Sequence, residues 1–386
     1  MTDNIKYMVC CACALAGLMV SCSSEDSEPT YPASEELVFV TAQQTRAAVS
    51  TTANLTAKPF ALYGDLRLAN GEGELSVLMN GREARYTSGK WNYGSTLYWF
   101  PNHIHSFIAL HPIEAVTTTR TVTGIEYNDG QMSLTYTHPD NYRNASDLLV
   151  ATHRRQYIQE LGKTAKPISF TFEHILAVLD IRIKYYEELA YSNWNNRIEV
   201  TEIVLDGINV AGSYSVRPDD LNTSNANSGT DGHNVNGWGN LKSGSRSFRG
   251  DTYNEWNTGH INGRYDTQFD VFKPVFKNND ALTVLPKDAG DVKLTMTFRL
   301  YVNGTYAADH TLSTVLENAE WKAGQKITYN LQVSVGEILQ GGCTYEDWNQ
   351  ISGLTETISD ASSDHDAGKG NLNLGEGWSD IKHDWQ

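Results

Sequence analysis

Residues 170–183 read Phe-Thr-Phe-Glu-His-Ile-Leu-Ala-Val-Leu-Asp-Ile-Arg-Ile. From Ile175 to Ile183 the chain is strongly apolar and rich in β-branched side chains, which pack well in sheets. A run of this length is typical of a strand that is covered on both faces. The sequence therefore predicts a central β-strand here, and the other segments are arranged around it.

Short apolar-alternating runs continue on both sides, separated by Gly, Asn and Pro. Strand-like runs of this kind predict a sandwich or barrel. We expect an all-β fold with short helices and long loops, built from two tandem β-sandwich domains at 47–165 and 166–349. The main strand-like runs are 37–40, 60–63, 97–100, 107–110, 121–123, 132–136, 198–205, 207–216, 281–285, 292–302 and 327–335.

Three segments depart from the strand pattern. Ser146–Arg155 reads as a short amphipathic helix. Residues 219–265 are dominated by Asn, Ser, Gly, Asp and Thr, which predicts a long insertion in the second domain with only local order. Residues 350–386 form a polar tail rich in Asp, Ser and Gly, in which Leu354–Ile358 alternates as a strand would.

The first 22 residues read as an export signal. Met8 to Val20 form an apolar stretch that is too short for a membrane span, which needs roughly 20 apolar residues. The stretch ends in Leu18-Met19-Val20-Ser21-Cys22, which resembles a bacterial lipobox with a small residue before the cysteine. We therefore predict a lipoprotein signal peptide at 1–22 and lipidation of Cys22, since multiple acylation gives stable anchoring. An ordinary secretory signal that ends near a cysteine is the alternative.

The segment that follows, 23–46, begins with an acidic and polar stretch that predicts a flexible tether. An acidic stretch after a lipidated cysteine resembles a surface-export signal, which favours the outer face of the outer membrane. Cys10, Cys11 and Cys13 would leave with the signal, so the mature chain keeps Cys22 and Cys343. Because Cys22 would be lipidated, no internal disulfide is expected and the cores must hold the fold.

Composition narrows the possible partners. The 386-residue chain has a net charge of −16, so nucleic acid and anionic headgroups are not expected to bind it. It contains 20 Tyr and 9 Trp, which suit β-sandwich cores as well as sugar stacking. The sequence offers no nucleophile elbow or phosphate loop, and adjoining acids such as Glu187-Glu188 do not indicate an active site, so we expect neither an enzyme nor a cofactor.

The order of several blocks resembles the fimbrillin family, the pilus subunits of Bacteroides-type Gram-negative bacteria. Each block is weak alone, but together they extend over most of the chain behind a lipobox. The blocks are Thr45-Arg46-Ala47, Phe60–Tyr63, Trp91–Tyr93, Tyr98–Pro101, Phe107–Pro112, Asp147–Ala151, Phe170–Ile183, Leu282–Pro286 and Glu320–Tyr329. In the last block Trp321, Gly324 and Tyr329 form a turn-and-strand pattern, with Gly324 permitting the tight turn.

This resemblance implies transthyretin-like sandwiches and a fimbrial subunit made as a lipoprotein precursor. It implies cleavage between Arg46 and Ala47, which would remove a leading strand at Leu37–Val40. A strand from another fimbrial subunit would then fill the exposed site, and head-to-tail docking would build a fibre. Stalk, tip and accessory roles remain open, and the surface receptor or glycan is unspecified.

Several single residues have both a structural and a functional interpretation. His103 and His105 alternate on one strand, but a metal site needs more convergent ligands, so none is expected. His174, in an apolar context, reads as a core or edge histidine, and a lone Cys343 reads as inert. The alternative function is a monomeric surface glycan-binding lipoprotein that uses exposed Trp238 and Trp256 as a platform.

Overall fold

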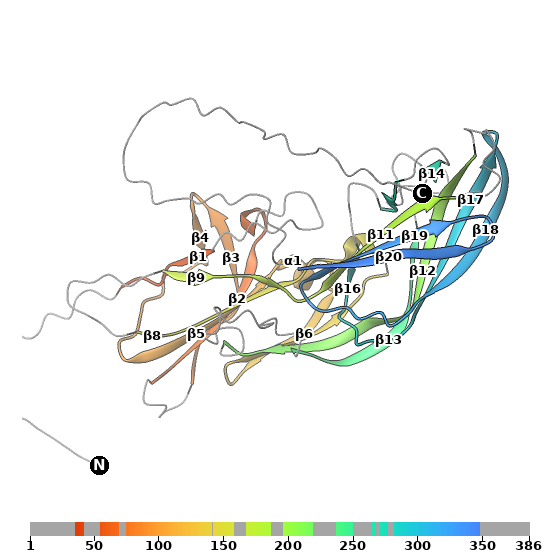
Figure 1. Cartoon of the computed structure of the whole chain (residues 1–386). Helices are drawn as coiled ribbons and strands as arrows, with labels where there is room; N and C mark the ends of the chain where they lie inside the picture. The colour runs from red at the N-terminus through yellow and green to blue at the C-terminus, as the bar shows by residue number, and fades with distance from the viewer. Residues whose placement is uncertain are drawn as a thin grey trace, which may run out of the picture.

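The computed structural model describes residues 35–41, 55–68, 75–140, 142–157, 167–186, 196–218, 237–249, 265–266, 271–276 and 282–347. Strands from the N-terminal half gather at one end and those from the C-terminal half at the other (Figure 1). The helical elements are short: α1 (Glu114–Thr117) and the 3₁₀ turns η1 (Leu55–Ala57) and η2 (Tyr142–Asn144). The all-β prediction is confirmed.

Twenty strands follow one another along the described residues. They are β1 (Phe39–Thr41), β2 (Phe60–Leu68), β3 (Ser76–Thr87), β4 (Lys90–Asn92), β5 (His103–His111), β6 (Val122–Asn128), β7 (Gln131–Thr137), β8 (Leu149–Tyr157), β9 (Ile168–Phe170), β10 (Glu173–His174), β11 (Ala177–Tyr185), β12 (Arg197–Val216), β13 (Trp238–Arg249), β14 (Tyr265–Asp266), β15 (Lys273–Pro274), β16 (Leu282–Val284), β17 (Val292–Val302), β18 (Thr305–Leu316), β19 (Gln325–Val333) and β20 (Ile338–Asp347).

The N-terminal sheet has the strand order β10-β8-β5-β2-β3-β4 and is apolar on both faces at its centre. Successive side chains of a strand point to opposite faces. On β5, Phe107 and Ala109 enter one buried cluster, whereas Ile108 and Leu110 enter another. Strands β2 and β8 alternate in the same way, so this sheet needs a covering layer on each side.

Different strands supply the two covering layers. The cluster on one face also contains residues of β1 and β9, and the cluster on the other contains residues of β6, β7 and the end of β12. Strand β1 pairs with β9 in the parallel sense, and β7 pairs with β6 and β12 in the antiparallel sense. The N-terminal half is therefore built in three layers.

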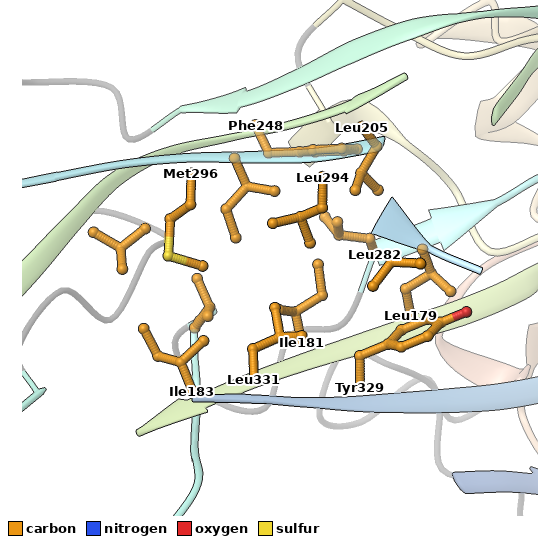
Figure 2. Close-up of a cluster of buried hydrophobic side chains, with 14 of the residues drawn as sticks. Leu179, Ile181, Ile183, Leu205, Phe248, Leu282, Leu294, Met296, Tyr329 and Leu331 are labelled. Carbon is orange, nitrogen blue, oxygen red and sulfur yellow. The ribbon is translucent and has the colours of Figure 1, made fainter. Parts of the chain in front are cut away.

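From Ala177 onward, the apolar run predicted at 175–183 forms the central strand β11, whereas Phe170 and Glu173–His174 belong to the separate strands β9 and β10. Strand β11 pairs in parallel with β19 on one edge and antiparallel with β15 and β16 on the other. Figure 2 shows Leu179, Ile181 and Ile183 of β11 meeting Leu294 and Met296 of β17 across the core. This confirms the prediction for the run and gives the C-terminal half its sandwich core.

The Trp321–Tyr329 block has the predicted form. Gly324 adopts a φ of +71°, which favours glycine, directly before β19. Its amide donates to the carbonyl of Leu176 over 2.8 Å, and the Trp321 indole donates to the Tyr329 hydroxyl over 3.0 Å. The block thereby fixes the turn that aligns β19 beside β11.

Strand β12 is 20 residues long and joins the two halves. Its first residues pair with β17, and residues 211–216 pair with β7 of the N-terminal half. Strand β9 also lies within the N-terminal core, although it follows residue 165. The predicted domains 47–165 and 166–349 therefore share one seven-stranded sheet, and the boundary between them stays a prediction.

Two local predictions differ from the structure. Ser146–Arg155 was expected to be helical, but its second half lies in β8, which pairs with β5 over nine positions. Sheet pairing outweighs a weak local helical pattern at this site. Within the predicted insertion at 219–265, β13 is a strand of 12 residues that pairs with β12 with three shifts of register. The strand is polar because most of its side chains are exposed, and its buried Phe248 packs into the C-terminal core.

In the part of the chain that the structure describes, no helix is long and apolar enough to cross a membrane.

We predict that acid destabilises the protein through two buried histidines. Burial lowers the pKa of His111 and of His138 to about 3, with nearby Lys58 and Arg246 acting in the same direction. An unfolded histidine titrates near its ordinary value of about 6.5. As pH falls from that value toward 3, the unfolded state takes up protons and the folded state does not, so stability declines by up to about 1.4 kcal/mol per pH unit for each group.

Urea unfolding at a series of pH values measures this slope. Because only the backbone of His138 is hydrogen-bonded among the described contacts, His138→Gln should fold and show a shallower slope below pH 6.5. His103→Gln, at a half-buried position, is the matched control for the substitution itself. An identical slope in His138→Gln contradicts the prediction.

Candidate functional site

The N-terminal segment 35–41 lies between strand β9 and the irregular segment 97–99, and Figure 1 shows β1 beside β9. On one edge the Leu37 amide donates to the Leu97 carbonyl, and the Trp99 amide donates to the Glu35 carbonyl, both over 2.8 Å. On the other edge the Ile168 amide donates to the Val38 carbonyl over 2.8 Å. Removing the segment would leave backbone groups unpaired on both sides.

The side chains of this segment alternate between the core and the surface. Leu37 and Phe39 are 0% and 2% exposed, whereas Val38 and Val40 are 41% and 39% exposed. This alternation follows the two-residue period of a strand. Leu37 and Phe39 therefore anchor the segment, and the valines contribute little burial.

Phe39 occupies an aromatic pocket. Its ring lies edge-on to Tyr93 and Phe107, with centroids 5.1 and 5.2 Å away, and stacks on Phe170 at 5.5 Å. Gly64 on β2 makes room for this arrangement, because a Cβ there would meet the Phe107 ring at 2.6 Å. Aromatic contacts of this kind stabilise a structure beyond simple burial of area.

Two polar side chains complete the site. The Tyr93 hydroxyl donates to the Leu37 carbonyl, and burial raises the pKa of Tyr93, which keeps it protonated as a donor. The Trp91 indole donates to the Thr41 hydroxyl over 3.4 Å. We call this set the leading-strand interface; it comprises Trp91, Tyr93, Leu97, Trp99, Phe107, Ile168 and Phe170. It bonds to the backbone of the leading segment and packs against the side chains of Leu37 and Phe39.

The predicted processing and lipidation residues, Cys22, Arg46 and Ala47, lie outside the described residues, as does 350–386. The predicted leading strand at 37–40 overlaps β1, which the structure places at Phe39–Thr41, and Leu37 and Phe39 lie in the N-terminal core. In the sequence, Arg46 comes shortly after Thr41. A cut after Arg46 would therefore disconnect the whole of 35–41 from the rest of the chain.

The proposed sugar platform is wrong at Trp238. That side chain is half-buried, its indole donates to the Ile175 carbonyl over 2.7 Å, and its ring packs against Tyr214 and Tyr136. It is part of the join between the two halves and not a free surface. Trp256 lies outside the described residues.

The histidines and Cys343 are engaged in structural contacts. His174 lies 2.8 Å from Asp147, and His105 accepts from the Phe100 amide over 3.2 Å and packs on Trp99. Burial raises the pKa of the Cys343 thiol, which makes it a poorer nucleophile. Among the described residues, no group of three or more metal-ligating side chains converges.

Sequence reasoning identified the leading strand but not its partners. Neither the parallel pairing with β9 nor the roles of Trp91 and Tyr93 were predicted, since these contacts join residues far apart in the chain. The available signal was the alternation of residues 37–40 together with the aromatic residues at 91–93.

A family model described as fimbrillin-like matches residues 45–348. Among solved structures, a fimbrial protein from Bacteroides vulgatus ATCC 8482 is similar, with a TM-score of 0.58 and 18% identity over 81% of this chain and 99% of that one. That likeness shows a shared fold.

Two further solved structures are more distant. A fimbrial assembly protein from Parabacteroides distasonis ATCC 8503 has a TM-score of 0.33 at 7% identity, over 81% of this chain and 99% of that one. A Bacteroides uniformis ATCC 8492 protein assigned to cell adhesion has a TM-score of 0.42 at 16% identity, over 82% and 99%. No curated protein sequence matches this chain.

We predict that Phe39→Ala lowers the free energy of unfolding by about 3–5 kcal/mol, because it empties an aromatic pocket that the surroundings cannot refill. Val38→Ala is the matched control on the outward face and should cost less than about 1 kcal/mol. Urea unfolding of the uncut protein measures both. Equal losses in the two variants would show that the inward face does not anchor the strand.

Proposed function

Because this chain belongs to the fimbrillin-like family, we propose that it is a structural subunit of a surface fimbrium, contributes to cell adhesion, and assembles by exchange of its leading strand. The observation that supports exchange is the position of residues 35–41: they complete an apolar core and precede Arg46 in the chain. The family and the fimbrial neighbour favour a structural role over an enzymatic one.

The energetics of the leading-strand interface favour exchange. While the chain is intact, the strand is held at high effective concentration by its covalent link. Cleavage between Arg46 and Ala47 removes that link, so the strand can dissociate. The emptied interface then exposes aromatic rings and unpaired backbone groups, which a second extended strand can cover.

Strand donation between subunits gives a head-to-tail contact that does not close on itself, and such a contact builds a fibre. The donor would come from another fimbrial subunit. In this proposal the tail at 350–386, which follows β20 in the chain, is a source of such a strand.

The N-terminal segments would direct the precursor to the cell surface. The signal at 1–22 would direct export, and lipid on Cys22 would hold the precursor in the outer membrane. The acidic tether at 23–46 would keep the body away from the membrane until Arg46 is cut. A receptor or glycan would bind elsewhere on the assembled fibre.

We predict that an arginine-specific protease cuts soluble protein that begins after Cys22, residues 23–386, at Arg46 and produces a ladder of oligomers. Intact mass locates the cut, and an unboiled gel shows the ladder. Arg46→Gln should abolish both.

Arg85→Gln is the control, because Arg85 is exposed and lies within a strand. It should be cut and should assemble as the wild type does. A wild-type chain that is cut after Arg46 and stays monomeric would refute assembly by exchange.

A further inference from the structure

Three buried polar side chains come together at the join between the two halves. They are Tyr136 of β7, His138 just after β7, and Arg246 of β13, which are 0%, 4% and 9% exposed. Among the described contacts, the Tyr136 hydroxyl, both ring nitrogens of His138 and the Nη2 of Arg246 are buried without a hydrogen-bond partner. Because buried polar groups in folded proteins are nearly always hydrogen-bonded, a partner for this set is expected.

The three side chains lie close to one another. The Nη1 of Arg246 donates to the His138 carbonyl over 3.0 Å, and the rings of Tyr136 and His138 lie edge to face with centroids 5.5 Å apart. The charge of Arg246 acts on both rings, since it lowers the pKa of His138 and opposes the rise that burial gives the pKa of Tyr136. Nη2 shares a carbon with Nη1, so the unbonded nitrogen of the guanidinium also lies beside His138.

The guanidinium of Arg246 carries a charge that no carboxylate contacts directly. Asp140 acts on Arg246 from a distance, but Asp140 is exposed and forms no ion pair with Arg246 in the part of the chain that the structure describes. A guanidinium stays protonated in proteins, and a buried charge without a partner is costly. Arg246 therefore needs a negative charge beside its Nη2.

All three side chains can donate a hydrogen bond to such a charge. Burial raises the pKa of Tyr136, so its hydroxyl stays protonated, and a neutral imidazole carries one N–H. One carboxylate, Asp147, also acts on Tyr136, though less strongly than Arg246 does. The Oδ1 of Asp147 already bonds to His174 over 2.8 Å. The donors together with one positive charge therefore suit a small anion.

We infer that Arg246, Tyr136 and His138 bind a monovalent anion of the halide class, such as chloride, at the join between the halves. The surroundings favour a small ion, because Tyr136 is fully buried and the ring of Trp238 packs against it with centroids 6.1 Å apart. Strands β7 and β13, which carry Tyr136 and Arg246, both pair with β12. The bound anion stabilises the join by linking these two strands through their side chains.

Urea unfolding in sodium chloride and in sodium gluconate at equal ionic strength tests the site. Equal ionic strength keeps the screening of the net charge of −16 the same in both salts. Chloride should raise the unfolding midpoint, and the rise should level off as the site fills. Identical midpoints in the two salts overturn the inference. The pH series with His138→Gln is run in gluconate, because a bound anion would favour the protonated form of His138.

Three variants locate the effect. Arg246→Met removes the charge and should abolish the dependence on chloride, whereas Arg249→Met, at an exposed arginine of β13 that pairs with Glu202, should keep it. Tyr136→Phe keeps the buried ring and should raise the half-saturating chloride concentration about tenfold, because a hydrogen bond to a charged group is lost. If Arg246→Met does not fold, Tyr136→Phe decides the matter. An unchanged chloride dependence in Tyr136→Phe overturns the site.

Crystals grown in sodium bromide distinguish an anion from a water molecule. Anomalous scattering from bromide should give a peak within bonding distance of the Arg246 Nη2 and the Tyr136 hydroxyl. A water molecule would instead bridge the Tyr136 hydroxyl and the Oδ2 of Asp147, which is buried without a hydrogen-bond partner among the described contacts. Density for water with no bromide peak overturns the inference and leaves the proposed strand exchange untouched.

Discussion

A sheet whose central strands are apolar on both faces needs a covering layer on each side, and the N-terminal half is organised around this requirement. Strands β2, β5 and β8 send alternate side chains into two separate cores. One core is closed by the β6–β7 hairpin and the end of β12, all of which are bonded into a larger sheet. The other is closed by β1 and β9, a pair of three-residue strands. The cover over the second core is thus the weaker one, because few backbone bonds hold it.

The weaker cover over the second core bears on the proposed exchange of the leading strand. Phe39 and Leu37 give the short leading strand enough burial to complete the core, yet the strand contributes few ladder bonds and has exposed valines on its outer face. In the proposed exchange, a segment of this kind is stable while covalently attached and replaceable once it is cut. The part of the molecule that is retained, from β2 to β20, keeps its own hydrogen-bonded sheets and the large C-terminal core. The proposed exchange would therefore change only one layer of the structure.

The two halves are joined through one continuous sheet. Strand β12 pairs with β17 at one end and with β7 at the other, and Trp238 of β13 reaches the Ile175 carbonyl. Tyr214, Val216 and Leu285, all from the C-terminal half, lie in the core beneath β6 and β7.

Local patterns in the sequence determined the β class, the central strand within 170–183, the turn at Gly324 and the alternation of the leading strand, because these depend on side-chain period and on glycine geometry. They also pointed to Arg46 and Cys22 as processing sites, which remain predictions. Only the tertiary structure decided that 149–157 is a strand, that Trp238 is a structural contact, and that residues 168–170 pair in parallel with the leading strand. Those outcomes depend on contacts between residues far apart in the chain. The free energy of pairing and burial there exceeds any local preference, so a pattern over a few residues could not reveal them.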